Sequence, residues 1–436
     1  MNRPMQTPAG RDVYVVDGSR TPFLKSRGTP GPFAAADLAH HAGRALFTRL
    51  DLDPQAVDEV ILGCVSPGPD EANIARVVAL RLGCGHDVPA MTVQRNCASG
   101  MQALASAADH IAAGAAHLVL AGGTEAMSRH PLLVAEAMQH WLALWGRARG
   151  VAARGRLLAR LRAGHFKPVI ALLRGLTDPV YGLSMGQTAE QLAADFDIGR
   201  EAMDAFAAAS HRRLAAAMDA GHLTEVEPLF DGAGTFYDAD TGLRRDTTPE
   251  GLARLAPVFD RPFGHVTAGN SAQVTDGAAL ALLASGEAVA RHRLPVLGRI
   301  ADIQWAALDP RRMGLGPVHA MAPIMERQGL ASADVDYWEI NEAFAAQVLA
   351  CLAAWRHEGF CRSALGREQP FAAIAETRLN VDGGAIGLGH PVGASGARIV
   401  LHLLKTLKRT GARRGMASLC VGGGQGGAML VERVED

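Results

Sequence analysis

The chain has 436 residues, of which 48% are hydrophobic and 20% charged, and its formal net charge is −1. This length predicts two or three domains, and the near-neutral charge gives no reason to expect nucleic-acid binding. No N-terminal signal pattern and no apolar run long enough to span a bilayer is found, so a cytoplasmic location is expected.

Strands and helices alternate along the first part of the chain. Apolar runs at 12–16 and 57–65 predict buried strands, and the helical spacing of apolar residues predicts helices at 34–50 and 72–82. The segment 18–31 is expected to be a loop. This alternation indicates a layered α/β domain.

The stretch 93–123 reads as strand, sharp turn, helix and strand. Cys97 falls at a turn of small residues where the helix begins, and the apolar strand at 117–121 ends in Gly122 and Gly123. Exposed N–H groups and the positive end of a helix dipole favour a thiolate, so Cys97 is a candidate nucleophile. The alternative is a small buried apolar residue, as most cysteines are.

The composition changes after residue 130. Segment 141–175 contains seven arginines and one lysine, interleaved with leucines, but no aspartate or glutamate. This pattern predicts a basic amphipathic helical insertion, facing solvent, an anionic membrane surface, another subunit or ligand phosphates. Two further helices are predicted at 185–196 and 200–220.

A second α/β half begins near Pro295, after an apolar strand at 276–284. A strand that runs into a helix is predicted at 338–345. Its segments repeat the first half: 335–339 corresponds to 57–61, 393–407 to the Cys97 turn and helix, and 418–423 to 118–123. Such a duplication places two helix N-termini near one pseudo-twofold axis, so the halves can share a site.

Three positions in this second half are candidates for chemistry. His390 lies in a glycine-rich loop just before a helix, and Asn341 lies at a strand-to-helix junction, where a polar side chain can hold a water. Cys420 ends a strand before a glycine run, which offers a second thiol and backbone N–H groups for an oxyanion hole. A phosphate-binding loop is disfavoured because the glycine run lacks the lysine of that motif.

The cysteines argue against two other roles. None of the six forms a C-x-x-C pair, so no metal site is expected. A disulfide framework is also not expected in so long a chain, which fits a reducing compartment. The six are Cys64, Cys84, Cys97, Cys351, Cys361 and Cys420.

The chain resembles the thiolase superfamily of acyl-CoA:acetyl-CoA C-acyltransferases. The matching motifs keep the family's order across nearly the whole chain: N-C-A-S-G at 96–100, A-G-G-T-E-A-M-S at 121–128, N-E-A-F-A at 341–345, G-H-P-x-G-A-S-G at 389–396 and C-x-G-G-G-x-G at 420–426. The resemblance implies a five-layered α/β/α/β/α fold. Its parts would be an N-terminal half (1–128 and 273–294), a loop domain covering coenzyme A (129–272, with the basic insertion 141–175) and a C-terminal half (295–436).

The resemblance also implies reversible thiolytic cleavage of a 3-oxoacyl-CoA. Cys97 would carry the acyl group as a thioester, His390 would activate Cys97, and Cys420 would be the acid/base at the α-carbon of acetyl-CoA. Asn341 would hold a water that completes an oxyanion hole with His390, and the N–H groups of Cys97 and Gly422 would form a second hole. Two thiols suit this chemistry, because a covalent acyl donor and a separate base for a weakly acidic C–H are needed together.

Coenzyme A would be a substrate rather than a resident cofactor. The residues expected to meet it or its acyl group are Met185, Ser184, Asn270, Ser271, Arg244 and Arg245. Three positions depart from the family pattern: Ser184 stands where many members have histidine, Ala272 where many have a pantetheine-contacting serine, and Asn341 where relatives with such a basic insertion have histidine.

The family suggests a homodimer or homotetramer. The basic insertion resembles that of thiolases in fatty-acid β-oxidation complexes, so a hydratase/dehydrogenase subunit or a membrane surface is a further expected partner. The alternatives are a biosynthetic acetoacetyl-CoA thiolase, and a non-catalytic acyl-CoA or lipid carrier or scaffold with this fold. A decarboxylating ketosynthase or hydroxymethylglutaryl-CoA synthase is disfavoured, because those would have histidine or glutamate in the role of Cys420.

Overall fold

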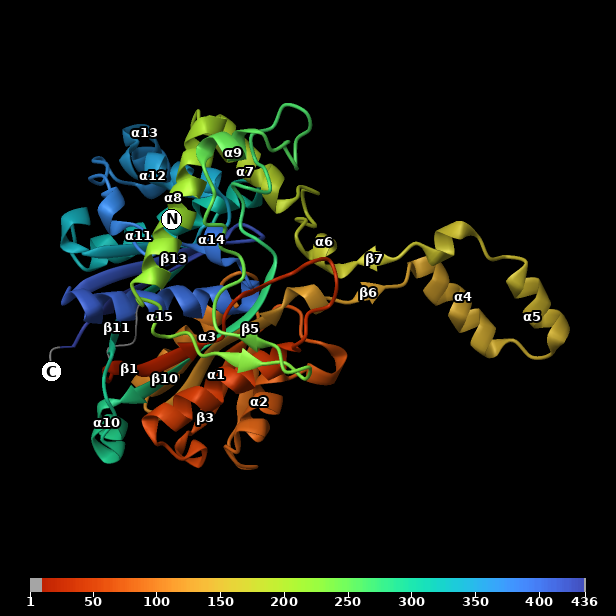
Figure 1. Ribbon diagram of the computed structural model, residues 1–436, viewed down its shortest axis with the longest axis horizontal. Coiled ribbons are helices and arrows are strands. Elements are labelled where there is room, and N and C mark those ends of the chain that lie inside the picture. The colour runs from red at the N-terminus through yellow and green to blue at the C-terminus, as the bar shows by residue number, and fades with distance from the viewer. Residues whose placement is uncertain (1–9, 435–436) are drawn as a thin grey trace.

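The computed structural model describes residues 10–434, and Figure 1 shows a layered body from which one long arm projects. The first half of the body contributes five strands with the order β4-β3-β5-β10-β1. β3 runs parallel to β4 and β5, and β10 is antiparallel to both β5 and β1. These strands are β1 (Val13–Arg20), β3 (Glu59–Gly63), β4 (Ala90–Val93), β5 (Leu118–Ala126) and β10 (Thr275–Ser285).

The second half repeats this arrangement with four strands in the order β12-β13-β14-β11. β12 is parallel to β13, and β14 is antiparallel to both β13 and β11, as β10 is to its neighbours. The duplication predicted from the sequence is therefore confirmed. The strands are β11 (Gly298–Ala307), β12 (Tyr337–Ile340), β13 (Arg414–Val421) and β14 (Gln425–Glu432).

The two halves join where β1 meets β11. Only two residue pairs, Tyr14 with Arg299 and Val15 with Gly298, make this antiparallel contact, which continues the hydrogen bonding into one ten-stranded sheet. The tenth strand is β2 (Leu24–Lys25), which pairs with β10. The loop predicted at 18–31 is therefore wrong in part, because β1 extends to Arg20 and β2 follows it.

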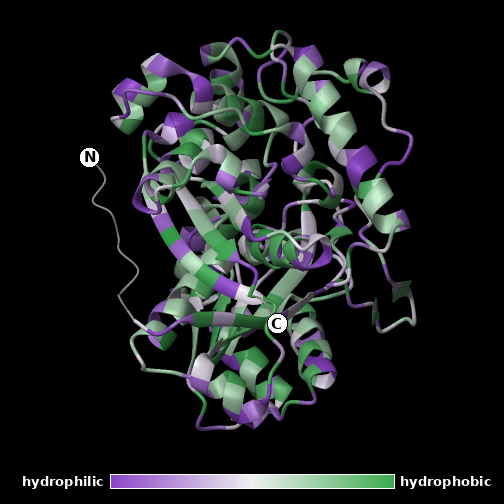
Figure 2. Cartoon of the chain, turned by 90° about the vertical axis from the view of Figure 1, so that its left-hand side faces the viewer, coloured by the Kyte–Doolittle hydropathy of each residue, from purple (hydrophilic) through white to green (hydrophobic). Residues whose placement is uncertain are grey.

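Two helices, α3 (Ser99–Ala112) and α15 (Val392–Thr410), pack against each other between the two halves. α1 (Ala35–Leu50) and α2 (Ile74–Leu82) cover the outer face of the first half. α11 (Gly316–Arg327) and α12 (Ala345–Arg356) lie on the second half. The order helix, sheet, helix, sheet, helix confirms the five-layered α/β class, and Figure 2 shows hydrophobic residues concentrated in the central strands and helices.

Glycines allow the two inner helices, α3 and α15, to pack closely. A Cβ on Gly100 would lie 2.8 Å from the carbonyl oxygen of Gly393, and one on Gly396 would lie 2.6 Å from the backbone nitrogen of Met101. A Cβ on Gly123, in β5, would overlap the Gly393 carbonyl outright. Any side chain at these points would push α3 and α15 apart, and with them the loops at their N-termini.

Residues 131–175 form the projecting segment, which we call the arm (Figure 1). Its helices are α4 (Glu136–Arg147), α5 (Val151–Leu158) and α6 (Ala171–Gly175), and a short pair of strands, β6 (Leu132–Leu133) and β7 (Val169–Ile170), closes its base. The predicted helical insertion is present, and its helices α4 and α5 contain no buried residue, so these two form without packing on the body. No helix among residues 10–434 is both long and apolar enough to cross a membrane.

The remaining elements complete the loop region and the second half. The loop region continues with α7 (Met185–Asp195), α8 (Arg200–Asp219), β8 (Leu229–Phe230), β9 (Phe236–Tyr237) and α9 (Pro249–Ala253). α10 (Gly286–His292) leads into the second half, where α13 (Glu358–Phe360) and α14 (Ala385–Leu388) are short. The boundaries proposed for the three parts of the chain stay predictions.

A buried ionic network ties the loop region to the body. Arg20, in β1, lies 2.7 Å from Asp240 and 3.4 Å from Glu225, and Glu225 lies 3.0 Å from Nδ1 of His402, in α15. Burial opposes the charge on His402, but the carboxylates of Glu225 and Asp382 outweigh it and raise its pKa to about 10. Burial likewise opposes the charge on Glu225, yet His402 and Arg20 lower its pKa to about 2. His402 and Glu225 are thus both held charged at neutral pH.

Candidate active site

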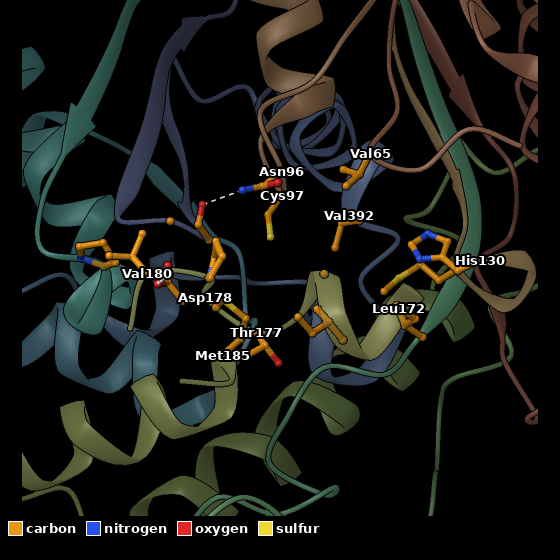
Figure 3. Close-up of a pocket in the computed structure, with 17 residues that line it drawn as sticks. Val65, Asn96, Cys97, His130, Leu172, Thr177, Asp178, Val180, Met185 and Val392 are labelled. Carbon is orange, nitrogen blue, oxygen red and sulfur yellow. Dashed lines mark hydrogen bonds between the residues drawn. The ribbon is translucent and has the colours of Figure 1, made fainter. Parts of the chain in front are cut away.

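Cys97 lies on a tight turn between β4 and α3. Asn96, just before it, has φ of 43°, the left-handed region that few residues other than glycine adopt. Its side-chain Nδ2 donates to the carbonyl of Gly422 at 2.7 Å, and its carbonyl accepts from the Ser99 hydroxyl at 2.7 Å. These contacts fix the turn, and Figure 3 shows the Cys97 sulfur pointing into a cavity beside it.

The environment of Cys97 corrects one expectation. Burial raises the pKa of its thiol, and the N–H groups of Gly422 and of Cys97 itself oppose this without reversing it. α3 begins only at Ser99, and the N–H groups of Ala98 and Ser99 bond to the carbonyls of Arg95 and Asn96. The helix terminus therefore does not make Cys97 a ready thiolate, and a base is needed.

His390 is placed to be that base. Its Nδ1 lies 2.7 Å from the hydroxyl of Ser395, and that hydroxyl donates to the carbonyl of Pro391 at 3.0 Å. Because the carbonyl can only accept, the hydroxyl's single hydrogen goes there, and Nδ1–H donates to the hydroxyl. This leaves the lone pair on Nε2, which is buried and has no hydrogen-bond partner among residues 10–434. Burial, followed by the charge of Arg398, lowers the pKa of His390 to about 4, so the ring is neutral.

Cys420 meets Cys97 and His390 at one cavity of about 300 Å³. It lies near the end of β13, just before the turn that carries Gly422. Burial raises the pKa of its thiol well above the ordinary range, and the neighbouring sulfurs of Cys97 and Cys351 add to the effect. Cys420 is therefore a protonated thiol facing the first sulfur, which suits an acid.

The N–H groups of Cys97 and Gly422 converge on the Cys97 sulfur. An acyl group bound to this sulfur would place its carbonyl oxygen within reach of two fixed donors, which is the arrangement of an oxyanion hole. Asn341 lies beside the His390 imidazole, with its Nδ2 3.5 Å from Nδ1 of the ring. It lines neither this cavity nor the next one, so its role as a water holder stays a prediction.

A second cavity, of about 250 Å³, adjoins the first and also reaches Cys97 (Figure 3). The two cavities share six lining residues, Cys97, Met127, Leu176, Thr177, Val392 and Met185, the last being the first residue of α7. Ser184 lines the larger cavity, and its hydroxyl accepts the N–H of Gln187 as the N-cap of α7. Two adjoining cavities at one sulfur give room for a substrate that extends beyond the reacting carbonyl.

The predicted coenzyme A contacts are distributed unevenly. Ser271 lines the larger cavity, together with Ala272. Asn270 does not line this cavity. Its side chain accepts the N–H of Thr267 and donates to Asp204. Arg245 pairs with Asp219, and neither Arg244 nor Arg245 lines either cavity. Contact between these last three residues and coenzyme A stays a prediction.

Two residues at or next to the smaller cavity were not predicted as site residues from the sequence. Glu125, in β5, is fully buried and accepts the N–H groups of Val65 at 2.8 Å and Ser66 at 3.0 Å. Nε2 of His130 lies 3.2 Å from the same carboxylate, and His130 lines the smaller cavity. A glutamate inside an otherwise apolar strand was the available signal, because buried carboxylates require partners.

No cluster of three or more histidine, cysteine, aspartate or glutamate side chains that could hold a metal ion occurs among residues 10–434. The groups that meet around Cys97 are two thiols, one neutral imidazole and backbone N–H groups. Such groups can form and break a thioester and move protons between sulfur, nitrogen and carbon.

Comparison with known proteins identifies the same chemistry. The family model described as "Thiolase, N-terminal domain" matches residues 13–287, and "Thiolase, C-terminal domain" matches residues 294–433. The chain is 40% identical to the beta-ketoadipyl-CoA thiolase of Pseudomonas knackmussii over 97% of its length and all of the relative's. It is 36% identical to the 3-ketoacyl-CoA thiolase of Yersinia enterocolitica, over 98% of both chains.

Solved structures agree with these sequence matches. The acetyl-CoA acetyltransferase of Bacillus anthracis superposes with a TM-score of 0.83 at 35% identity, covering 98% of this chain and all of that one. Human mitochondrial 3-ketoacyl-CoA thiolase in complex with CoA superposes with a TM-score of 0.83 at 36% identity, covering 97% and 98% of the two chains. The resemblance found in the motifs is confirmed.

Proposed function

The chain belongs to the thiolase family and is an acyltransferase, and we propose that it catalyses reversible thiolytic cleavage of a 3-oxoacyl-CoA by coenzyme A. Coenzyme A is a substrate in this reaction. The single observation that carries the proposal is the meeting of Cys97, His390 and Cys420 at one cavity. A non-catalytic carrier would have no use for two thiols and a neutral imidazole held together.

The first half-reaction breaks a carbon–carbon bond. Nε2 of His390 takes the proton of Cys97, and the thiolate attacks the C3 carbonyl of the substrate. The N–H groups of Cys97 and Gly422 hold the oxyanion that forms. The C2–C3 bond then breaks, C3 remains on Cys97 as a thioester, and the C2 carbanion takes the proton of Cys420 and leaves as acetyl-CoA.

The second half-reaction restores the enzyme. The Cys420 thiolate takes the proton of an incoming coenzyme A thiol, whose sulfur attacks the thioester. Cys97 leaves as a thiolate and recovers its proton from the His390 imidazolium. Protons and charges balance over the cycle, and the products are acetyl-CoA and an acyl-CoA shortened by two carbons. Run backwards, the same steps form the carbon–carbon bond.

The test is to incubate the protein with 3-oxohexanoyl-CoA and coenzyme A. We expect butanoyl-CoA and acetyl-CoA in equal amounts, and a butanoyl adduct on the peptide that contains Cys97 by mass spectrometry. Cys97→Ala should abolish both results. Cys84→Ala removes a buried cysteine outside both cavities and serves as the control. Binding of the thioester without products would identify a carrier instead.

The relatives bear on the alternative of a biosynthetic enzyme limited to acetoacetyl-CoA. The name beta-ketoadipyl-CoA thiolase denotes a substrate longer than acetoacetyl-CoA. The smaller cavity gives this chain room for more than a methyl group beyond the reacting carbonyl. We therefore favour a longer acyl group. Rates on a series from acetoacetyl-CoA upward measure this directly.

The arm supports a proposal about location. Its charged residues between 141 and 175 are all basic, and large apolar side chains on it are strongly exposed, including Val151 at 89% and Phe166 at 64%. We propose that the arm binds an anionic membrane surface from the cytoplasmic side, because cations and apolar groups together suit the headgroup region. We expect the protein to sediment with phosphatidylglycerol vesicles but not with phosphatidylcholine vesicles. Deleting residues 136–170 should abolish this sedimentation. Binding of a hydratase/dehydrogenase subunit with no binding to vesicles would contradict it.

We also propose a homo-oligomer. Among residues 10–434, β4 (Ala90–Val93) pairs on one side only, with β3, and it is half-buried and carries no charged side chain. Unprotected edge strands pair with other chains, and a second copy would extend the sheet. Light scattering should give at least twice the 45.8 kDa chain mass, and Met91→Lys should lower it. A monomer in the wild type would contradict this.

A further inference from the structure

Glu342 is a buried carboxylate that the proposed mechanism does not use. It follows Asn341 directly in the chain, it is fully buried, and it lines neither cavity. Its two oxygens accept three hydrogen bonds, which come from three separate segments of the chain. Burying a carboxylate is costly unless donors are provided for it, so this arrangement calls for a function.

The three donors connect the loop region to the segment that carries His390. The hydroxyl of Ser210, in α8, donates to Oε2 of Glu342 at 2.6 Å, and the backbone N–H of Ile386, in α14, donates to the same oxygen at 3.2 Å. Nδ2 of Asn380 donates to Oε1 at 2.8 Å. α14 lies against α8 and ends two residues before His390 (Figure 1).

The polarity of these contacts is fixed. The backbone N–H of Ile386 can only donate. The Asn380 amide cannot flip, because its Oδ1 accepts the N–H of Ile340 and its Nδ2 donates to the Ile340 carbonyl, both at 2.9 Å. The Ser210 hydroxyl can rotate, but it shares its acceptor oxygen with the Ile386 N–H, which cannot. Only an ionised carboxylate, which accepts at both oxygens, satisfies all three donors.

The segment that Glu342 holds is also held from its other side. Nε2 of Gln273 donates to the carbonyl of Ile386 at 3.0 Å, and the Gln273 carbonyl accepts the N–H of His390 at 3.0 Å. Glu342 and Gln273 thus clamp Ile386 between them, and the clamp sets where the imidazole lies. Asn341, next to Glu342 in the chain, has its Nδ2 3.5 Å from Nδ1 of the same ring.

We propose that Glu342 is a positioning residue for His390: as an ionised acceptor it holds the segment 380–390 so that Nε2 of the ring faces Cys97. The proposal rests on the proposed function, in which His390 is the base for Cys97. A displacement of about 1 Å can cost about 100-fold in rate. The alternative is that Glu342 only stabilises the fold. Its removal would then lower stability without changing how Cys97 loses its proton.

The first test is Glu342→Gln, which keeps the shape of the side chain but directs an NH2 group at either Ile386 or Asn380, both fixed donors. We expect kcat on 3-oxohexanoyl-CoA to fall about 10- to 100-fold, with KM changed less than about 3-fold. Glu432→Gln is the matched control, because Glu432 is a buried glutamate on β14 that bonds two arginines outside both cavities. It should lower stability but leave kcat within about 3-fold of wild type.

The second readout is the rate at which iodoacetamide alkylates Cys97, followed against pH by mass spectrometry of the Cys97 peptide. A correctly placed His390 takes the thiol proton, so at neutral pH the wild type should react about 10- to 100-fold faster than Glu342→Gln. This gap should close as the pH rises through the pKa of the Cys97 thiol, because the thiolate then forms without a base. A purely structural loss would give a gap that does not depend on pH.

Reversing the polarity of one partner should restore part of the rate. In the double variant Glu342→Gln/Asn380→Asp, the new NH2 group meets a carboxylate, and the net charge equals that of the wild type. Asn380 has φ of 44°, a left-handed conformation that aspartate also adopts. We expect kcat of the double variant to exceed that of Glu342→Gln by about 3- to 10-fold. Asn380→Asp alone, which places two carboxylates in contact, should lose as much rate as Glu342→Gln.

Should Glu342→Gln fail to fold, Ser210→Ala removes only one donor and should show the same pH-dependent gap at about 3- to 10-fold. A kcat for Glu342→Gln within about 3-fold of wild type, a gap that is independent of pH, or no recovery in the double variant would overturn the proposal. Absence of turnover in the wild type would overturn the proposed function instead. The alkylation rates of Cys97 would then still decide the role of Glu342.

Discussion

Nδ1 of His390 lies 2.7 Å from the hydroxyl oxygen of Ser395, one turn into the helix that begins just after the histidine. Both groups are buried, and the hydroxyl is itself fixed by the Pro391 carbonyl. A small side chain inside a helix thereby selects which nitrogen of the catalytic imidazole faces the cavity. The hydrogen bond at Nδ1 also orients the ring, because Nε2 has no hydrogen-bond partner among residues 10–434.

Ser395→Ala should therefore slow acylation of Cys97 more than it weakens the fold. We expect a loss of about 10- to 100-fold in kcat with KM little changed, because the wrong tautomer becomes accessible. The free energy of unfolding should fall by only about 1 kcal/mol. Ser395→Thr, which keeps the hydroxyl, should recover part of the rate. Equal losses in both Ser395 variants would show that packing, and not the hydrogen bond, matters.

Cys420→Ala should separate the two halves of the chemistry. Acylation of Cys97 by butanoyl-CoA needs no proton at carbon, so it should remain within about 10-fold of wild type. Exchange of the C2 hydrogens of acetyl-CoA with deuterated water should fall at least about 100-fold. Cys351→Ala is the matched control, because Cys351 is a buried thiol near Cys420 that lines neither cavity. Survival of exchange with loss of acylation would mean that the roles are reversed.

The low pKa of His390 predicts the acid limit of the reaction. The neutral ring is the form that accepts a proton, and its pKa of about 4 keeps it neutral above that pH. Single-turnover acylation after a rapid pH jump should lose rate only as the pH falls through about 4. An ordinary histidine would give a limit near 6.5. A midpoint near 6.5 would show that the ring is not desolvated in the working enzyme.

Gly123→Ala should disrupt the contact between the inner helices. Its Cβ would overlap the Gly393 carbonyl, which is backbone and cannot move aside. We expect a loss of about 3 kcal/mol or more in unfolding free energy, together with loss of activity. Gly146→Ala, in α4 of the arm, has nothing within 4 Å of the added carbon and should be neutral or slightly stabilising. Denaturant unfolding of both variants gives the comparison.

The His402 network predicts how stability changes at alkaline pH. In the folded chain His402 keeps its proton up to about pH 10, whereas an unfolded histidine releases it near 6.5. Its stabilising contribution is thus complete below pH 6.5 and is lost as the pH rises toward 10. The difference in unfolding free energy between wild type and His402→Gln should shrink over that interval. A difference independent of pH would show that His402 is not charged in the folded state.

The contribution of Glu225 to stability changes with pH in the opposite direction to that of His402. The pKa of Glu225 is lowered from 4.5 to about 2, so its contribution is complete above pH 4.5 and is lost as the pH falls toward 2. Glu225→Gln should therefore flatten the acid limb of the stability profile relative to wild type. His402→Gln should flatten the alkaline limb instead.

Much of the fold was predictable because its signals are local. Periodicity placed α1, α2, α7 and α8 within two residues of their observed ends. Repeated segments revealed the duplication, since they are visible in one dimension. β5 was the exception: Gly122 and Gly123 suggested that the strand ends, yet it continues to Ala126. These glycines are needed for close packing against β10 and Gly393, which no local pattern reveals.

The site was predictable in its residues but not in its electrostatics. Motifs identified Cys97, His390 and Cys420, which meet at one cavity. The direction of the Cys97 pKa was wrong, because desolvation depends on side chains from distant segments and the neighbouring N–H groups are used inside the turn. His130 was missed because its significance comes from Glu125 and the cavity, which exist only in three dimensions.

The hydrogen bond from Asn96 to Gly422 joins residues 326 positions apart in the chain. A ribosome needs roughly 15–65 s to add that many residues. For most of that time the nascent protein has α3 but not α15, so the apolar surface of α3 that packs on α15 has nothing to cover it. Chaperones that hold unfinished chains should therefore associate with this protein until its last strands emerge. Premature termination anywhere before β14 should yield aggregates rather than a stable half-enzyme.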